Sequence, residues 1–166
     1  MGEAELSAEV VVVGGGLAGL SAALEAAEAG AQVIVLEMLS ETGGSSAMSG
    51  GCFALAGTDL QREHGIEDSD ELLFQDLREV GQFENDEAIV RTYVRHQLST
   101  YEWLKAHGVK FSQALEVSSG VSVPRIHNVD PADMMRALLA RITLVPELFP
   151  SLWVDFNPCS SYNTLY

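Results

Sequence analysis

The chain has 166 residues, and its 24 acidic side chains against nine lysines and arginines give a formal net charge of −15. Because like charges repel, this balance disfavours nucleic acids and anionic membranes as partners. Two cysteines form no disulfide framework, the acidic N-terminus does not resemble a signal peptide, and no apolar run is long enough to span a membrane. We therefore expect about one globular domain, in the cytoplasm.

A strand, a glycine-rich turn and a helix open the chain. Val10–Val13 predict a buried strand, and small apolar residues at helical spacing follow over residues 17–27. Between them stand three glycines in the spacing G-x-G-x-x-G, which in this context predicts dinucleotide binding. The first permits the turn, the second lets a pyrophosphate approach the backbone, and the third lets the helix pack closely. The predicted phosphate-binding residues, at a helix N-terminus, are Gly14, Gly15, Gly16, Leu17, Ala18 and Gly19.

A second strand completes the unit. Gly30 is placed to end the helix, and Gln32–Leu36 read as a strand. Glu37 follows it, eighteen residues after Gly19, where a carboxylate accepts hydrogen bonds from ribose hydroxyls. An acid here disfavours a 2′-phosphate and hence NADP. Glu37 and its neighbour Met38 therefore join the predicted cofactor site.

An uncharged segment follows, from Thr42 to Thr58, in which glycine, serine and alanine dominate. Such a composition predicts a loop and a short helix pressed against something large, flat and partly polar. The first interpretation is the bed of a cofactor, and the alternative is a buried linker. A plain NAD-binding domain has no need of this second glycine cluster.

Together, residues 12–20, 33–37 and 43–51 resemble the FAD-binding domain of the fumarate reductase and succinate dehydrogenase flavoprotein family. The resemblance implies an α/β fold with a Rossmann-like parallel sheet, FAD as cofactor and hydride transfer through the flavin. Some members carry a flavin-linked histidine at a position that falls on Gly44 here, which implies noncovalent FAD. It also implies that the glycine turn lines the pyrophosphate and that Glu37 holds the adenosine ribose. Beside the flavin and its ribityl chain it places Gly43, Gly44, Ser45, Ser46, Ser49, Gly50 and Gly51.

The middle of the chain predicts two further helices. Asp68 or Ser69 is placed to cap a helix that runs to Val80, and Asn85 to cap one from Asp86 to about His107. Val109–Phe111 read as a short strand. His64, His96 and His107 lack partners at ligand spacing, so we expect them on the surface and predict no metal site.

Another predicted helix begins at Pro131, with Asp130 as its cap. In the loop before it, Arg125 and His127 are predicted to line the substrate pocket near the flavin edge, with a solvated loop as the alternative. This proposed role follows from the resemblance.

The last segment, residues 143–166, departs from the family, although Leu152–Phe156 fit its third parallel strand. We expect an FAD-binding domain, truncated, over residues 1–142, and a divergent, partly disordered tail after it. The function expected is that of an FAD-dependent oxidoreductase acting on a small molecule, present as an N-terminal portion. The alternative is a nucleotide-binding fragment without turnover, because the capping domain and proton-donating arginine of relatives are not found here.

Overall fold

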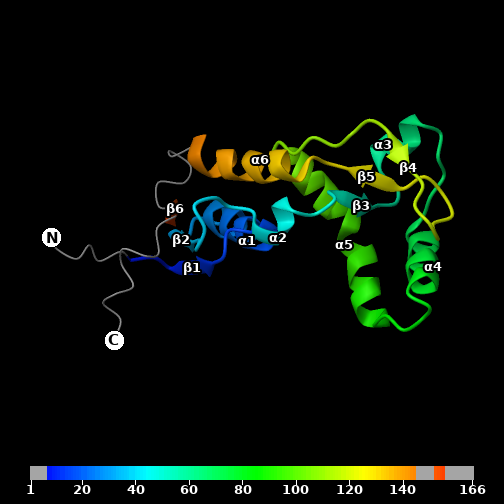
Figure 1. The fold of residues 1–166 in the computed structure, drawn as a ribbon, viewed down its shortest axis with the longest axis horizontal. Helices are drawn as coiled ribbons and strands as arrows, with labels where there is room; N and C mark the ends of the chain where they lie inside the picture. Colours follow the sequence, from blue (N-terminus) through cyan, green and yellow to red (C-terminus); the bar gives the residue numbers. More distant parts are fainter. Residues whose placement is uncertain (1–6, 145–151, 156–166) are drawn as a thin grey trace. The chain divides into compact units, whose positions relative to one another are not determined.

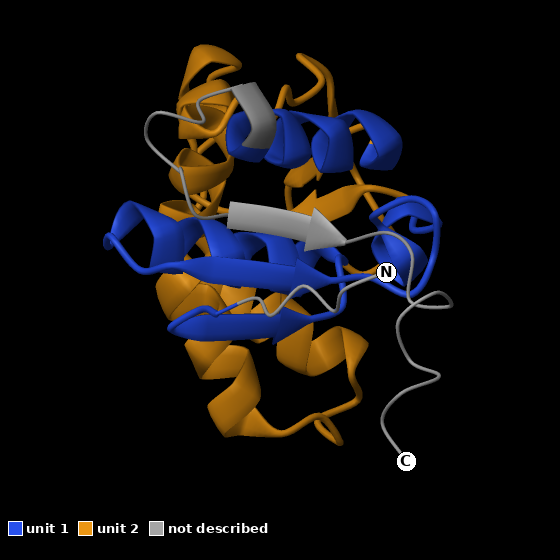
Figure 2. Ribbon diagram, turned by 90° about the vertical axis from the view of Figure 1, so that its left-hand side faces the viewer, with its two compact units in different colours: residues 1–49, 131–166 blue, residues 50–130 orange. Residues whose placement is uncertain are grey.

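The computed structural model describes the backbone of residues 7–144 and 152–155. The chain divides into two compact units, shown in different colours in Figure 2. Unit 1 contains residues 1–49 and 131–166, and unit 2 contains residues 50–130. The elements of both units are labelled in Figure 1.

Unit 1 is built on a parallel sheet of three strands in the order β1-β2-β6. The strands are β1 (Val10–Val13), β2 (Val33–Leu36) and β6 (Leu152–Asp155). Val33, at the start of the central strand, is in register with Val10 on one side and Leu152 on the other. The prediction of a third parallel strand near residue 152 is therefore confirmed. The prediction of a partly disordered tail falls largely on residues 145–151 and 156–166, which lie outside the described residues.

Three helices accompany this sheet: α1 (Leu17–Glu28), α2 (Gly44–Ala47) and α6 (Pro131–Leu144). Helix α1 packs on β1 and β2, and α6 packs on α1 and α2. The buried face of α1 alternates leucine with alanine, and the small alanines allow close approach. The buried side chains of α1 are Leu20, Ala23, Leu24 and Ala27.

Helix α1 ends as the sequence predicts. Gly30 adopts a φ of 91°, a conformation that glycine accepts at little cost. Its amide donates to the carbonyl of Ala27, and the amide of Ala31 donates to the carbonyl of Ala26 at 3.0 Å. This pair of bonds is the Schellman arrangement, which satisfies carbonyls that the helix end leaves free.

Unit 2 combines helices with a small antiparallel sheet of order β3-β5-β4. Its apolar cluster centres on Leu73, Val90 and Val94, where α4 packs on α5. The elements of unit 2 are β3 (Cys52–Ala54), α3 (Asp59–Glu63), α4 (Asp70–Val80), α5 (Glu87–Ala106), β4 (Leu115–Glu116) and β5 (Ile126–Asn128).

The caps of unit 2 correct one sequence prediction. The hydroxyl of Ser69 accepts the amide of Leu72 and caps α4, as predicted. The cap of α5 is Asp86, however, and not Asn85. Asn85 instead donates to the carbonyl of Leu77 at 2.8 Å and so ties the turn to α4. Asparagine and aspartate are both favoured as N-caps, so the sequence pattern alone could not distinguish between these two adjacent positions.

Two other predictions in unit 2 are wrong. Residues 109–111 form no strand; the short strand of this region is β4, four residues later. His107 is not a surface residue, because only 8% of it is exposed and its ring stacks on Trp103 at 3.9 Å. In the described part of the chain, no helix is both long and apolar enough to cross a membrane.

Candidate functional site

The glycine turn between β1 and α1 is shaped by two different constraints. Gly14 has a φ of 103°, which side chains other than glycine rarely adopt, and its amide donates to the carbonyl of Leu36. A Cβ on Gly19 would lie 1.9 Å from the carbonyl oxygen of Gly14. The first glycine therefore permits the turn, and the third lets the helix reach the strand.

Gly16 is constrained by neither of these. It caps α1 with a φ of −74°, and a Cβ there would meet Oγ of Ser46 at 3.6 Å and the carbonyl oxygen of Gly43 at 3.7 Å. These are ordinary contact distances, so the protein itself tolerates a side chain at Gly16. In a dinucleotide-binding turn, a glycine at this position lets a phosphate come close to the backbone at the N-terminus of the helix.

The start of α1 offers unpaired donors at this position. Within the described residues, the amides of Gly16, Ala18 and Gly19 have no recorded acceptor, whereas Leu20 already donates to the carbonyl of Gly16. The amide of Leu17 donates to Oγ of Ser46 at 3.1 Å. Free amides at the positive end of a twelve-residue helix favour an anion. The turn thus fits a diphosphate.

Glu37, at the end of β2, is held by the backbone around the turn. The amide of Leu39 donates to its Oε1 at 2.8 Å, and the amide of Gly15 donates to its Oε2 at 2.7 Å. These bonds, that of Leu39 foremost, lower the pKa of Glu37 below its ordinary value despite partial desolvation. The carboxylate therefore stays ionised near neutral pH, and each oxygen keeps a lone pair for a ribose hydroxyl.

The second glycine segment is joined directly to the first. The amide of Gly43 donates to the carbonyl of Gly15 at 2.9 Å, and the hydroxyl oxygen of Ser46 accepts the amide of Leu17. Gly43 has a φ of 124°, and a Cβ there would lie 2.7 Å from that of Ala47. Glycine at this position therefore allows α2 to start against the phosphate turn.

The remaining predicted cofactor residues are Met38, Ser45, Ser49, Gly50 and Gly51. Met38 is 76% exposed, a high value for an apolar side chain. Met48, which was not among the predicted residues, is 80% exposed. Ser45 and Ser49 are exposed too, and the hydroxyl of Ser49 donates to the carbonyl of Ser46. Gly50 and Gly51 belong to unit 2, where the carbonyl of Gly51 accepts the amide of Val129.

Arg125 lies in the interior of unit 2, with none of its side chain exposed. Its Nη2 is 3.0 Å from a carboxylate oxygen of Asp68 and 3.0 Å from one of Asp76. Its Nε and Nη1 have no recorded acceptor among the described residues. Asp68 also accepts from Gln61, and Asp76 from the hydroxyl of Ser122. The guanidinium therefore joins α3, α4 and the loop before β5.

His127, on β5, is equally buried, and its hydrogen bonds define its tautomer. Nδ1 lies 2.8 Å from the carbonyl of Arg125, which accepts only, so Nδ1 carries the proton. Nε2, 2.9 Å from Oγ1 of Thr58, then accepts the hydroxyl proton of Thr58. That oxygen in turn accepts the amide of Gln61. Desolvation lowers the pKa of His127, so the ring is neutral at physiological pH.

The interpretation of residues 125–127 as a solvated loop is therefore wrong, since both side chains are buried. Their role in lining a substrate pocket stays a prediction. Thr58 was not among the predicted site residues, and its capping box with Gln61 starts α3. The signal was present, because a threonine followed three residues later by glutamine is typical of a helix start.

Comparison with known proteins agrees with this geometry. The profile of the FAD binding domain family matches residues 9–141, which include the glycine turn, Glu37 and the second glycine segment. The chain belongs to this family. Its cofactor is FAD.

Relatives of the FAD-binding domain include reductases from several bacteria. The fumarate reductase (cytochrome) of Shewanella frigidimarina is 39% identical over 119 residues, which are 72% of this chain and 21% of that protein. The urocanate reductase of Eggerthella lenta is 41% identical over 100 residues, or 60% of this chain and 16% of that protein. The chain thus spans about a fifth of the length of such relatives.

Among solved structures, the open conformation of a flavocytochrome c3 fumarate reductase matches with a TM-score of 0.77 and 28% identity. The match covers 90% of this chain and 27% of that one. A 3-ketosteroid dehydrogenase from Rhodococcus jostii matches with a TM-score of 0.73 and 26% identity, over 92% of this chain and 38% of that one. Both units of the FAD-binding domain therefore have counterparts within larger flavoproteins.

Proposed function

We propose that this chain is the FAD-holding part of a flavoenzyme of the fumarate reductase and succinate dehydrogenase type. The single observation that carries the proposal is the N-terminus of α1. There the amides of Gly16, Ala18 and Gly19 have no acceptor among the described residues, and Gly16 is a glycine although the protein would tolerate a side chain at that position. Relatives named for the reduction of fumarate, acrylate and urocanate support a small unsaturated acid as substrate. Bound FAD would supply the hydride-transferring ring.

The residues of unit 1 have separate tasks in this proposal. The amides of Gly16, Ala18 and Gly19 receive the diphosphate, and the carboxylate of Glu37 receives the adenosine ribose. Residues 43–49 line the ribityl chain and the flavin. With Gly44 at the position of the flavin-linked histidine, the cofactor is held without a covalent bond. The parallel sheet and glycine turn support a Rossmann-like assignment for this unit.

We further propose that residues 1–142 are the N-terminal part of the FAD-binding domain, which the match over residues 9–141 supports. We also propose a cytoplasmic location for the chain. Gly50, Gly51, Arg125 and His127 keep their proposed places near the flavin. Because burial keeps His127 neutral and both of its ring nitrogens are already hydrogen-bonded, it orients its strand and does not deliver a proton. Arg125 has a positioning role as well, since its guanidinium is held between two aspartates, Asp68 and Asp76.

We expect the chain on its own to bind FAD weakly and to reduce no fumarate. In two-part flavoenzymes a second domain closes over the substrate, excludes water and completes the catalytic set. FAD binding is measured by quenching of flavin fluorescence on titration with the chain, and turnover by fumarate-dependent oxidation of a reduced viologen dye. Absence of any FAD binding contradicts the cofactor assignment. A turnover rate well above that of free flavin contradicts the interpretation that this chain is only part of the enzyme.

A further inference from the structure

A pocket of about 260 Å³ lies in unit 2, between strand β3 and helix α5. Phe53, on β3, and Leu55, directly after it, line one wall, because residues two apart in an extended segment face the same side. The other lining residues come from α5, apart from Phe111. None of the predicted FAD-binding residues lines this pocket.

Three polar side chains of the pocket walls are already engaged in hydrogen bonds. The hydroxyl of Tyr93 donates to the carbonyl of Ala54 at 2.7 Å. Gln97 exchanges hydrogen bonds with both backbone groups of Ala56, each at 3.0 Å. The hydroxyl of Tyr101 donates to Oδ1 of Asp59 at 2.7 Å. These bonds fix the walls, and the surface that they leave towards the pocket is mainly carbon.

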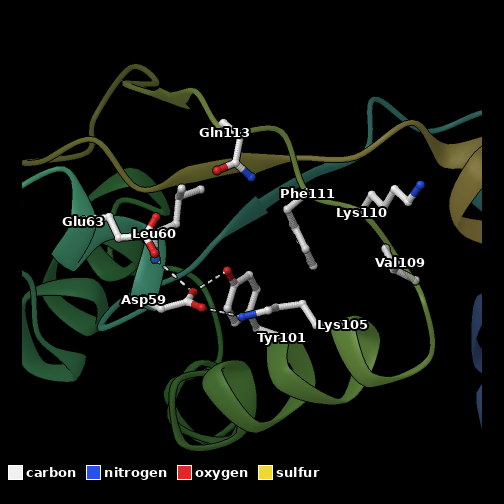
Figure 3. A pocket seen from close by; sticks show the side chains of 9 residues that line it. All are labelled: Asp59, Leu60, Glu63, Tyr101, Lys105, Val109, Lys110, Phe111 and Gln113. Atoms are coloured by element: carbon white, nitrogen blue, oxygen red, sulfur yellow. Dashed lines mark hydrogen bonds and ion pairs between the residues drawn. The ribbon is translucent and has the colours of Figure 1, made fainter.

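Aromatic rings make up much of that surface. The ring of Phe111 meets that of Phe53 edge to face, with 5.9 Å between the centroids. It also lies 4.7 Å from the ring of Tyr101, in a tilted arrangement. Figure 3 shows Phe111 beside Tyr101, whose hydroxyl points towards Asp59. Rings that are held in this way can offer a face or an edge to one further ring.

The mouth of the pocket is polar. Thr92, His96 and Thr100 line the pocket, are exposed, and lie four residues apart on α5. This spacing places them in one row on the helix surface. Their hydroxyl and imidazole groups can form hydrogen bonds with a polar group that remains at the mouth.

We propose that this pocket binds a neutral, flat molecule of one or two fused aromatic rings that carries a single polar substituent. The rings pack on Phe53 and Phe111, and the substituent stays at the mouth beside His96 and Thr100. Apolar cavities of about 150 Å³ accept benzene, so this space is sufficient for two rings. A ligand with a polar group at each end fits less well, because the group that enters the apolar interior loses its bonds to water. The site is separate from the proposed FAD site, and binding there does not depend on FAD.

The test is a titration of the isotope-labelled chain with 2-naphthol, followed by the side-chain chemical shifts of Phe53 and Leu104, which both line the pocket. We expect a dissociation constant in the millimolar range or below. Decahydro-2-naphthol has the same carbon skeleton without aromatic rings and should bind about two- to tenfold more weakly. Naphthalene-2,6-diol carries a second hydroxyl at the opposite end and should bind at least about fivefold more weakly. These three compounds are compared on the original chain, so the comparison does not depend on the folding of a variant.

Phe53→Leu removes one ring and keeps the wall apolar. The affinity for 2-naphthol should fall about two- to tenfold, and that for decahydro-2-naphthol should not change. Phe74→Leu is the matched control, because Phe74 is a partly buried phenylalanine of the same unit that does not line the pocket. It should leave both affinities unchanged.

Three results would each overturn the proposal. The first is the absence of shifts at Phe53 and Leu104 up to the solubility limit of 2-naphthol. The second is equally tight binding of 2-naphthol, decahydro-2-naphthol and naphthalene-2,6-diol, which would indicate adsorption without a shaped apolar site. The third is an equal loss of 2-naphthol affinity in Phe53→Leu and Phe74→Leu, which would indicate a general loosening of unit 2.

Discussion

Replacement of Gly16 by valine should separate cofactor binding from folding. A Cβ at this position makes only ordinary contacts, at 3.6 Å and 3.7 Å, and the φ of −74° suits any residue. The stability cost is therefore that of a poor N-cap, about 1 kcal/mol. The branched side chain, however, fills the space through which a phosphate reaches the free amides of α1.

The loss of affinity follows from those amides. Hydrogen bonds to a charged group contribute about 1.5–3 kcal/mol each, so losing two of them costs about 3–6 kcal/mol, or a factor of about 10² to 10⁴ in affinity. Flavin fluorescence quenching gives the dissociation constant, and thermal unfolding followed by circular dichroism gives the stability. Gly16→Ala should show a smaller loss of affinity than Gly16→Val.

Ala29→Val is the matched control, because it adds bulk at the exposed opposite end of the same helix. It should leave FAD affinity unchanged. If Gly16→Val binds FAD as tightly as the original chain, the phosphate does not lie above α1 and the reasoning is refuted. If it unfolds, the claim that the protein tolerates a side chain at Gly16 is wrong.

Three other changes test the site and its surroundings. Gly19→Ala should destabilise the fold even without FAD, seen as a lower denaturant midpoint, because its Cβ would lie 1.9 Å from a carbonyl oxygen. The pKa of Glu37 is lower in the folded chain than its ordinary 4.5, so its contribution to stability is present above that pH and is lost as pH falls below it. Glu37→Gln should therefore reduce the loss of the free energy of unfolding at acidic pH. An unchanged dependence on pH in this range counts against the two backbone hydrogen bonds to Glu37. Arg125→Met should cost about 3–5 kcal/mol by denaturant unfolding, because two buried carboxylates lose their cation, while Arg91→Met at an exposed ion pair should cost under about 1 kcal/mol; similar values for both would refute the buried network.

The sequence was sufficient for the parts of unit 1 that local chemistry determines. The spacing of the turn glycines predicted the tight turn between β1 and α1, because the structure shows a backbone requirement at Gly14 and a packing requirement at Gly19. The same held for Gly30, whose positive φ ends α1. The uncharged segment correctly indicated a short helix, now α2, but not that Ser46 would cap a helix 29 residues earlier. Contacts between distant segments leave no periodic signal.

Unit 2 shows why the rest could not be predicted. Arg125 and His127 are polar residues in a stretch without periodicity, so a loop near solvent or a pocket was the natural interpretation. Their burial depends on Asp68, Asp76 and Thr58, which lie about 50 to 70 residues away in sequence. Charged groups enter an interior only when such partners are present. The pairing that makes burial possible is visible only in the folded chain.

The hydroxyl of Ser46 at the amide of Leu17 bears on the order in which the holoprotein is assembled. A serine hydroxyl both accepts and donates, so it can keep the amide of Leu17 and still offer its own proton to an arriving phosphate oxygen. The cradle is thereby shaped before its ligand arrives, and ligand binding then adds stability to a site that already exists. Removal and re-addition of FAD should accordingly be reversible, and the rate of FAD rebinding should exceed the rate at which the unfolded chain refolds.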